Sequence, residues 1–473
     1  MCVGIAFYSA IFPVYRTFFL VEISYNEGWN VYNAWMVAHH VPLYGFRAGW
    51  TTVNYPALSF FLIAQLSRLT HDFLFTGRAL SLLGLAATGV IVGVIVRRIT
   101  GSKLPALLAG CYCVALFCSI ADFYVGADDP QLLAQAVFAA GVLLYVSRRD
   151  SGVALIAVAL LFVLGGNIKH NQIDFPLAVF LDLCLTSWRR ARNFCSAVIA
   201  FAAVAIFANV ELGGHFFLEQ ILTPRPYSVM RVFQAGEYYG PLLLPFVAAC
   251  VTAIKIRRDP RARVICLFFV VSLFFGVASR GGIGVTINSY FSNTVAIAIL
   301  LGVFFDKVSR LAQPSSVREL LFKAGVPLAL FFWLLIPMQC NEILGPRKNW
   351  REVHEAQARF KTQVDFLRAQ PGPILCESLL RCYEADKPYI YDPFNSTSLI
   401  HAGLLDADTI VERIRKQEYG AIQFTHPPSA DGEPASSPER FAEPILDATA
   451  EYYRVALVDR DCAIYIPKNS VKP

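Results

Sequence analysis

Two carboxylates, Glu22 and Glu27, stand in an aromatic-rich stretch (EISYNEGWNVYNAWMVAHHVPLY) that directly follows the first apolar run of the chain. A carboxylate held in place can act as a general base, because it takes the proton of an attacking hydroxyl or amine as the new bond forms. The alternative is that both are ordinary loop acids that face water. The choice depends on the elements that would position them.

A second acidic pair, Asp128 and Asp129, precedes Pro130 and another apolar run. Because Asp before Pro suits the start of a helix, one interpretation is capping of the helix that follows. The functional interpretation gives Asp129 a catalytic role and lets Asp128 orient an acceptor or the hydroxyls of a sugar. The two interpretations are compatible.

Cations near apolar runs are candidates for binding an anion. Lys169 and His170 (NIKHN) stand at the end of a short apolar run, and a cation near membrane depth is costly unless it is paired or functional. A phosphate is the ligand we expect there, with Arg78 and Arg280 as weaker candidates for the same role. The alternative for Lys169 is snorkelling to the interface.

Other polar residues carry weaker signals. Asn288 and Tyr290 belong to a glycine-rich loop and the run after it (SRGGIGVTINSYF), where they are candidates for contacting an acceptor or sugar, although an ordinary turn explains them as well. No G-x-x-x-x-G-K-[ST] motif is present, so the glycines do not form a phosphate-binding P-loop. His39 and His40 are typical of interfacial polar residues, and no cysteine spacing indicates a zinc site.

The composition places these residues in a membrane protein. Of 473 residues, 56% are hydrophobic and only 16% charged, whereas soluble domains carry about 25% charge. The first 345 residues hold 25 basic and 16 acidic residues, and the last 128 hold 16 and 19. The basic excess lies between apolar segments, which excludes nucleic-acid binding as its explanation and is typical of cytoplasmic loops.

Eleven segments are candidates for membrane spans, each predicted from an apolar run near the ~20 residues that a span needs. They cover residues 1–20, 73–96, 104–121, 130–146, 153–166, 175–185, 194–212, 239–254, 264–278, 290–305 and 320–338. Each even-numbered span is followed by Lys or Arg, for example Arg97 and Arg98, so those loops are predicted to be cytoplasmic. The N-terminus is then cytoplasmic and the C-terminal part lies outside.

The segments outside the spans have their own predicted structure. Residues 30–41 and 57–69 are predicted to be amphipathic helices in the membrane interface. The last 128 residues are predicted to form a small α/β domain, with helices over 353–367 and 409–417, strands over 373–377, 389–391 and 421–425, and a terminal hairpin of 453–458 with 462–466. Cys376 and Cys382 can pair if this domain is extracytoplasmic.

Several short motifs together resemble the GT-C superfamily of polyprenyl-phosphate-sugar-dependent glycosyltransferases. The acid after the first span is followed by Gly28, a short aromatic helix, PLY and a YP-x-L turn. GRALS (77–81), YVGADDPQLL (124–133), NIKHN (167–171) and the loop SRGGIGVTINSYF also fit. The chain is similar in particular to bacterial relatives of dolichyl-phosphate-mannose-protein mannosyltransferases and of lipid A aminoarabinose transferases.

The resemblance implies an α-helical polytopic membrane protein, with a transmembrane domain over 1–345, a catalytic external loop over 21–56 and a periplasmic α/β domain over 346–473. It implies inverting transfer of a monosaccharide from a polyprenyl-phosphate donor to a lipid, glycan or protein acceptor at the periplasmic face of a bacterial inner membrane. Lys169, His170, Arg78 and Arg280 would bind the phosphate. No cofactor is required, and a divalent metal at the Asp128–Asp129 pair is compatible with the sequence but not indicated by it.

The chain departs from the family pattern at one position. Relatives often carry Asp-Glu in the first loop with the Asp as base, whereas this chain has Asn26 and Glu27. Asn cannot act as a base at neutral pH, so Glu27 becomes the first candidate, Glu22 the next, and Asn26 a candidate for sugar binding. The alternatives are a transporter or lipid flippase, and a catalytically inactive relative that serves as a binding protein.

Overall fold

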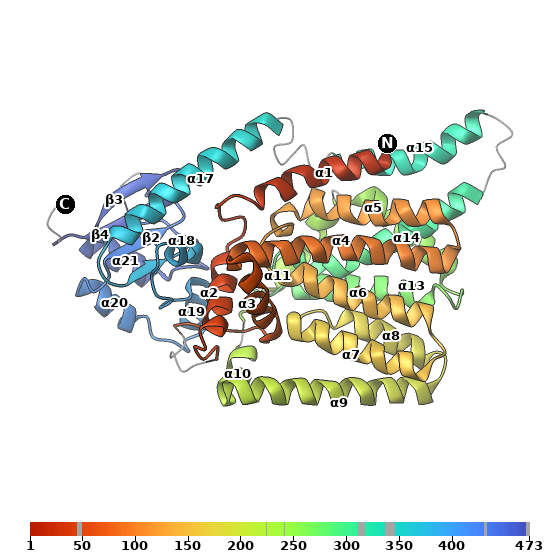
Figure 1. Ribbon diagram of the computed structural model, residues 1–473, viewed down its shortest axis with the longest axis horizontal. Coiled ribbons are helices and arrows are strands. Elements are labelled where there is room, and N and C mark those ends of the chain that lie inside the picture. The colour runs from red at the N-terminus through yellow and green to blue at the C-terminus, as the bar shows by residue number, and fades with distance from the viewer. Residues whose placement is uncertain are drawn as a thin grey trace.

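The computed structural model describes residues 1–44, 50–223, 225–240, 242–310, 317–335, 346–429 and 433–469. Its N-terminal part is a bundle of helices lying side by side, and its C-terminal part is a small α/β domain at one end of that bundle (Figure 1). The helix α1 runs from the N-terminus toward this domain, and α2 and α3 lie at the same end (Figure 1). One end of the bundle is therefore joined to the C-terminal domain.

The bundle is formed by apolar helices of unequal length. They are α1 (Cys2–Arg16), α4 (Phe73–Thr100), α5 (Lys103–Ile120), α6 (Gln131–Ser147), α7 (Gly152–Ile168), α8 (Asp174–Cys184), α9 (Trp188–Gly213), α12 (Leu243–Ile256), α13 (Arg263–Ser279), α14 (Phe291–Arg310) and α15 (Val317–Trp333). Short helices α10 (His215–Ile221) and α11 (Val229–Phe233) lie between α9 and α12. Each predicted span overlaps one of the eleven bundle helices, although part of the last predicted span, residues 336–338, lies outside the described residues.

Local sequence signals set several helix ends. The side chain of Asp72 accepts a hydrogen bond from the backbone N–H of Phe75 and caps α4, and Ser151 caps α7 in the same way. Gly101 ends α4 in the left-handed conformation that glycine adopts without a Cβ penalty. By length and composition, four described helices are able to cross a membrane, or five if the bent pair around α12 is one span, and others are shorter. The number of spans stays a prediction.

The two predicted interfacial helices exist, as α2 (Asn26–Ala38) and α3 (Leu58–Thr70), but α2 is more enclosed than predicted. Its polar residues Glu27, Asn30 and Asn33 are fully buried. An amphipathic helix in the interface exposes its polar face, whereas α2 packs between α4 and the C-terminal domain. The carboxylate of Glu27 and the side-chain amide nitrogens of Asn30 and Asn33 are hydrogen-bonded to protein groups, whereas the amide oxygens of both Asn residues have no partner among the described residues.

The C-terminal domain contains a four-stranded sheet in the order β1-β2-β4-β3. Strand β1 (Ile374–Cys376) pairs parallel with β2 (Ala421–Phe424), while β2 and β3 (Tyr453–Asp459) pair antiparallel with β4 (Cys462–Pro467). The predicted terminal hairpin and the other two strands at these places are confirmed. The predicted helices 353–367 and 409–417 are confirmed as α17 (Pro346–Ala369) and α20 (Asp408–Arg415).

The strand predicted over residues 389–391 is wrong. Tyr389 and Tyr391 are both buried, but the segment pairs with no strand among the described residues. The helices α18 (Leu379–Glu384), α19 (Pro393–His401) and α21 (Glu443–Tyr452) were not predicted. The predicted domain boundary lies between residues 345 and 346. Residues 336–345, on its N-terminal side, are outside the described residues.

Candidate active site

Two cavities flank α2 where the bundle meets the C-terminal domain. Cavity 1, of about 1120 Å³, is lined by the end of α1, by α2, by the start of α4 and by the segment that follows α18. Cavity 2, of about 400 Å³, is lined by the start of α2, by the loop before α3, by the loops after α5 and α7 and by the first turns of α14 and α19. None of the described residues lines both cavities, so α2 and its neighbours separate them.

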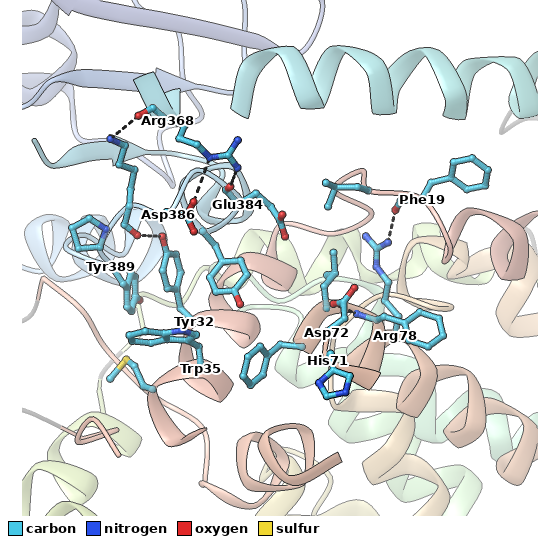
Figure 2. A pocket seen from close by; sticks show the side chains of 18 of the residues that line it. Phe19, Tyr32, Trp35, His71, Asp72, Arg78, Arg368, Glu384, Asp386 and Tyr389 are labelled. Carbon is cyan, nitrogen blue, oxygen red and sulfur yellow. Dashed lines mark hydrogen bonds and ion pairs between the residues drawn. The ribbon is translucent and has the colours of Figure 1, made fainter. Parts of the chain in front are cut away.

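Cavity 1 has an apolar side and a charged side. Phe18, Phe19 and Trp35 contribute aromatic surface from the bundle. Arg368 and Glu384 lie across from them on the C-terminal domain, as Figure 2 shows. Burial and then the nearby Asp72 raise the pKa of Glu384 to about 6.

The wall of cavity 2 holds a buried acid–cation pair. The ammonium nitrogen of Lys169 lies 3.1 Å from Oδ1 of Asp129 and donates to the hydroxyl of Tyr55 at 2.7 Å. Asn26 donates from Nδ2 to Oδ2 of Asp129 at 2.9 Å. Lys169, Asn26 and Tyr55 all line the cavity, and Asp129 lies directly behind them. Four residues from separate parts of the chain therefore form one hydrogen-bonded group.

Glu27 forms a second, deeper pair with Arg78. Nε of Arg78 donates to Oε1 of Glu27 at 2.7 Å and Nη2 donates to Oε2 at 2.8 Å. The remaining N–H groups of Arg78 reach the backbone carbonyls of Thr17, Phe19 and Val21. Glu27 is fully buried and does not line either cavity. All the donors of Arg78 are engaged by protein groups, and both oxygens of Glu27 are engaged as well.

Glu27 also holds the loop that carries the acidic pair. The backbone N–H of Asp128 donates to Oε1 of Glu27 at 3.0 Å, and the side chain of Asn30 donates to the carbonyl of Asp128 at 2.7 Å. Together with the hydrogen bond from Asn26 to Asp129, α2 forms three hydrogen bonds with residues 128 and 129. These bonds hold the carboxylate of Asp129 next to Lys169.

The side chain of Asp128 turns away from cavity 2 toward α4. It packs so closely on Gly77 that a Cβ at position 77 would lie 1.9 Å from its Oδ1. Burial, and then the negative charges of Glu27 and Asp129, raise the pKa of Asp128 well above its usual value. The motif GRALS therefore supplies two contacts to the acidic loops, one through the bare backbone of Gly77 and one through Arg78.

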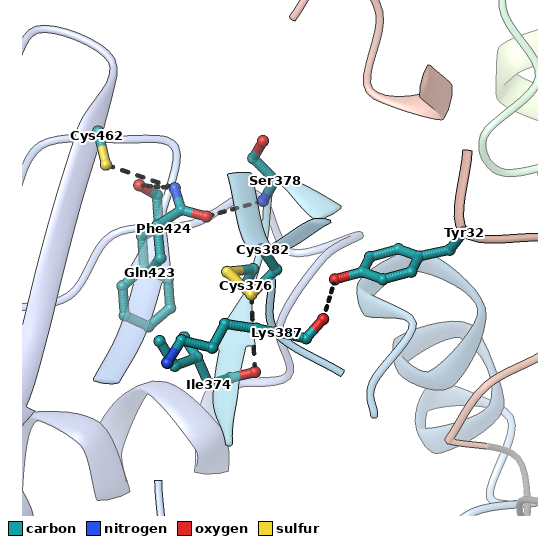
Figure 3. The surroundings of a disulfide bond; sticks show 9 residues. All are labelled: Tyr32, Ile374, Cys376, Ser378, Cys382, Lys387, Gln423, Phe424 and Cys462. Atoms are coloured by element: carbon teal, nitrogen blue, oxygen red, sulfur yellow. Dashed lines mark hydrogen bonds between the residues drawn. A yellow bond between two sulfur atoms is a disulfide. The ribbon is translucent and has the colours of Figure 1, made fainter. Parts of the chain in front are cut away.

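Glu22 contacts the C-terminal domain. Its Oε2 lies 3.2 Å from Nη1 of Arg381 in α18, and burial raises its pKa to about 7 even though Arg381 opposes the shift. Gly28 lies against the same helix, because a Cβ there would be 2.0 Å from the backbone nitrogen of Leu380. The predicted pairing of Cys376 with Cys382 is present and ties α18 to β1 beside Tyr32 (Figure 3). The domain thus docks through α18 on the helix that carries Asn26 and Glu27.

The other predicted residues divide between the cavity and its surroundings. His170 is exposed and lines cavity 2, where its ring contacts Tyr55, and Asn288 also lines it. Arg280 and Tyr290 do not line it. Tyr290 is buried and stacked on Tyr238, and Arg280 donates to the backbone carbonyl of Val285.

Some residues of cavity 2 were missed or left open by the sequence. Arg440 of the C-terminal domain was missed, and its guanidinium lies over the ring of Tyr25. Arg225 from the segment before α11 adds another cation, and the sequence left open whether it contacts a ligand or faces water. Asp174 and the amides of Gln131 and Gln172 also line the cavity. No local motif distinguishes these residues, since only the fold brings them together.

The arrangement suits the binding of an anion next to a proton acceptor. The three N–H donors of Lys169 are directed to the hydroxyl of Tyr55 and to both carboxylate oxygens of Asp129, so a ligand in cavity 2 would have to displace one of these contacts. An anion bound there would compete with Asp129 for Lys169 and make the carboxylate a better acceptor of protons. No group of three or more metal-ligating side chains occurs among the residues that the structure describes.

Comparison with known proteins gives the fold. No protein-family model and no curated protein matches the sequence. Among solved structures, the chain is similar to ArnT from Cupriavidus metallidurans, with a TM-score of 0.61 at 14% identity over 98% of this chain and 97% of that chain. The same enzyme bound to undecaprenyl phosphate gives a TM-score of 0.58 at 13% identity over the same shares of both chains.

A more distant similarity connects the chain to the oligosaccharyltransferase of Archaeoglobus fulgidus tethered with an acceptor peptide. The TM-score is 0.51 at 11% identity, over 89% of this chain and 68% of that chain. The chain therefore shares its overall fold with ArnT and with this oligosaccharyltransferase. It is a multi-pass membrane protein with a small C-terminal sheet, as the sequence predicted. At these sequence identities the similarity establishes the architecture alone. The chemistry of the protein has to be inferred from the residues of the site.

Proposed function

We propose that the protein is an inverting glycosyltransferase that moves a monosaccharide from a polyprenyl-phosphate donor to an acceptor at the extracytoplasmic face of the membrane. The observation that carries the proposal is the buried Asp129–Lys169 pair, which stands beside a polar cavity at the junction of the bundle with the C-terminal domain. Acid and cation are the two groups that such a transfer requires. The GT-C fold and the complex of ArnT with undecaprenyl phosphate support it.

The donor headgroup occupies cavity 2 in this proposal. Lys169 and His170 face the phosphate, and Arg225 and Arg440 add positive charge from the other walls. As the bond between the anomeric carbon and the phosphate oxygen breaks, negative charge grows on the departing lipid phosphate. Lys169 stabilises that charge, and it does so strongly because it is buried.

Asp129 is the proposed base because its carboxylate is paired with Lys169, a cation that lines cavity 2. It is separated from the cavity only by Asn26 and Lys169, and its pairing with Lys169 loosens when a phosphate engages the ammonium. The acceptor's hydroxyl or amine attacks the anomeric carbon from the face opposite the phosphate, and Asp129 takes its proton. Glu27 and Glu22 remain candidates for this role, but each is bonded to an arginine away from cavity 2.

The remaining predicted residues support the reaction in different ways. Glu27 and Arg78 act as positioning residues that hold the loop of Asp128 and Asp129. Asn26 and Asn288 face the sugar from the cavity wall. Arg280 and Tyr290 have weaker support as ligand contacts, because neither lines the cavity.

Cavity 1 is the proposed site of a part of the acceptor that does not react, because α2 separates this cavity from the donor in cavity 2. Its aromatic side suits an apolar or lipid portion, and its charged side suits a polar headgroup, whether the acceptor is a lipid, a glycan or a protein. Arg78 lines this cavity while it holds Glu27, so cavity 1 ends beside the network that positions Asp129. Membrane lipids border the bundle.

The proposed orientation places both cavities outside the cytoplasm. The basic residues at the C-terminal ends of α4 and α14 favour a cytoplasmic position for those ends. The disulfide of the C-terminal domain favours an oxidising compartment for that domain, such as the bacterial periplasm. The N-terminus is then cytoplasmic and the protein resides in the inner membrane.

The test uses the purified full chain in lipid nanodiscs. Binding of undecaprenyl phosphate is measured by native mass spectrometry for the wild type, for Lys169→Met and for the control Lys255→Met, whose lysine is exposed at the end of α12. We expect binding by the wild type and the control and at least a tenfold loss in Lys169→Met. Failure of the wild type to bind undecaprenyl phosphate contradicts the proposal.

Turnover is tested in membrane vesicles that contain native acceptors. Radiolabelled sugar carried on undecaprenyl phosphate should enter an acceptor fraction with the wild type and not with Asp129→Asn, although Asp129→Asn should still bind undecaprenyl phosphate. Because Asn26 replaces the acid that relatives often carry, an inactive binding protein is a second candidate. Binding without any transfer by the wild type would favour it.

A further inference from the structure

A cluster of buried amides lies where the helix bundle borders cavity 2. Gln131 and Gln172 line the cavity, and Gln135 lies one turn further along α6. Their exposed fractions are 1%, 3% and 0%. Nε2 of Gln172 donates to Oε1 of Gln135 at 2.7 Å, which orients both amides.

The cluster has more hydrogen-bonding groups than its protein neighbours satisfy. Both amide atoms of Gln131, Nε2 of Gln135 and Oε1 of Gln172 have no partner among the residues that the structure describes. Buried polar groups in native proteins are nearly always paired with protein, water or ligand. Groups left open in an apolar bundle, on side chains that line a cavity, indicate a polar ligand in that cavity.

An acidic residue, Asp174, lies in the same cavity as these amides. Asp174, at the start of α8, lines the same cavity and is buried, yet it forms no ion pair with any described residue. Its carboxylate accepts hydrogen bonds from the backbone N–H of Phe175 and from the side chain of Ser292, and acceptor capacity remains on its two oxygens. Ser292, in the first turn of α14, lines the cavity as well.

The cluster adjoins the proposed reaction centre on both sides. The backbone N–H of Gln131 donates to Oδ1 of Asp129 at 2.8 Å. Gln172 lies three residues after Lys169 in the loop between α7 and α8. A group attached to a phosphate at Lys169 would therefore extend toward these amides.

We propose that Gln131, Gln172 and Asp174 form a subsite that recognises the monosaccharide of the donor by hydrogen bonds to its hydroxyl groups. A sugar hydroxyl both donates and accepts hydrogen bonds. An amide offers a donor and an acceptor side by side, and a carboxylate accepts from hydroxyls, so the hydrogen-bonding groups of the subsite match those of a sugar. The proposal rests on the proposed function and deepens it, since it makes these residues determinants of sugar specificity. The predicted ligand is a sugar that retains several ring hydroxyls.

The experiment compares a bare lipid with lipids that carry a sugar. Binding of undecaprenyl phosphate, undecaprenyl phosphate glucose and undecaprenyl phosphate mannose is measured for the wild type, Gln131→Leu and Gln172→Leu in nanodiscs. We expect the wild type to bind at least one sugar lipid about tenfold more tightly than the bare lipid, which corresponds to one net hydrogen bond or a little more. Each Leu variant should lose that preference while its affinity for the bare lipid stays within twofold.

A matched control separates recognition from folding. Asn293 in α14 is also fully buried, but its amide is satisfied by Phe269, Ser272 and Tyr239. Asn293→Leu should lower the unfolding temperature and leave the preference for sugar lipids unchanged. Gln131→Leu should leave the unfolding temperature unchanged or raise it, because it removes open polar groups.

The outcomes distinguish the two proposals. If the wild type binds neither the bare lipid nor the sugar lipids, the proposed function fails. If the wild type binds all three lipids equally, or if Gln131→Leu and Gln172→Leu weaken all of them to the same degree, the proposed function stands and the amide subsite is refuted. A fall in unfolding temperature in both Leu variants together with an unchanged sugar preference assigns the amides to the fold and also refutes it.

Discussion

Replacing Arg78 by Met should destabilise the fold strongly. Glu27 and Arg78 are both almost completely buried and are joined by two charge-assisted hydrogen bonds of 2.7 and 2.8 Å. Arg78→Met leaves a buried carboxylate without its counter-charge and releases three backbone carbonyls. Removing one partner of a buried pair costs about 3–5 kcal/mol, and an unfolding entropy of about 2 cal/mol/K per residue amounts to about 1 kcal/mol per °C for this chain, so we expect the unfolding temperature to fall by about 3–5 °C.

The assay is thermal unfolding of the purified protein in detergent, followed by intrinsic fluorescence. The control is Arg310→Met, because Arg310 pairs with Asp306 while its own side chain is 62% exposed, and such pairs contribute about 0–1 kcal/mol. The double variant Glu27→Gln/Arg78→Met should recover part of the loss, since it removes the unpaired charge. Arg78→Met unfolding within 2 °C of Arg310→Met, or a double variant whose loss is the sum of the single losses, would refute this reasoning.

Two further predictions concern the contact between α2 and the C-terminal domain. Gly28→Ala should lower the unfolding temperature, because the added Cβ collides with the backbone of Leu380. The control Gly166→Ala, in a helix with open space around the added Cβ, should be neutral or stabilising. Equal effects of the two substitutions would count against the close contact at Gly28. The pKa of Glu22 is raised to about 7 in the folded protein from 4.5, so folding favours its protonated form and the contribution to stability is lost as pH rises from about 4.5 to 7. At about 1.4 kcal/mol per pKa unit this is at most about 3 kcal/mol. Thermal unfolding from pH 4.5 to 8 should show this slope in the wild type and in the exposed-site control Glu412→Gln, and a slope that persists in Glu22→Gln would exclude Glu22 as its source.

The helices of the bundle were predictable because their signal is local. A long apolar run forms a helix in a membrane whatever it packs against, so each predicted span overlaps a helix. Helix α2 was placed correctly but its surroundings were not, because the burial of Asn30 depends on the loop of Asp128 and on the docking of α18. The spacing of Tyr389 and Tyr391 is typical of a strand. The segment pairs with no strand among the described residues, so the pattern reflects only the burial of the two tyrosine side chains.

The candidate site was predictable in its residue types and less so in its pairings. Sequence named Asn26, Asp129 and Lys169, and the structure brings these three together. It did not predict that Glu27 would be paired with Arg78, because 51 residues separate them and no local rule links them. Gln131 falls inside a predicted span and was not singled out, since a buried amide becomes informative only when its missing hydrogen-bond partners are known.

The most direct test of the account is a cryo-electron microscopy map of the full chain in nanodiscs with undecaprenyl phosphate. The account predicts density for the phosphate in cavity 2, within hydrogen-bonding distance of the ammonium nitrogen of Lys169, with the isoprenoid chain leaving toward the membrane. Density for the phosphate in cavity 1 beside Arg78, or anywhere distant from Lys169, would contradict it.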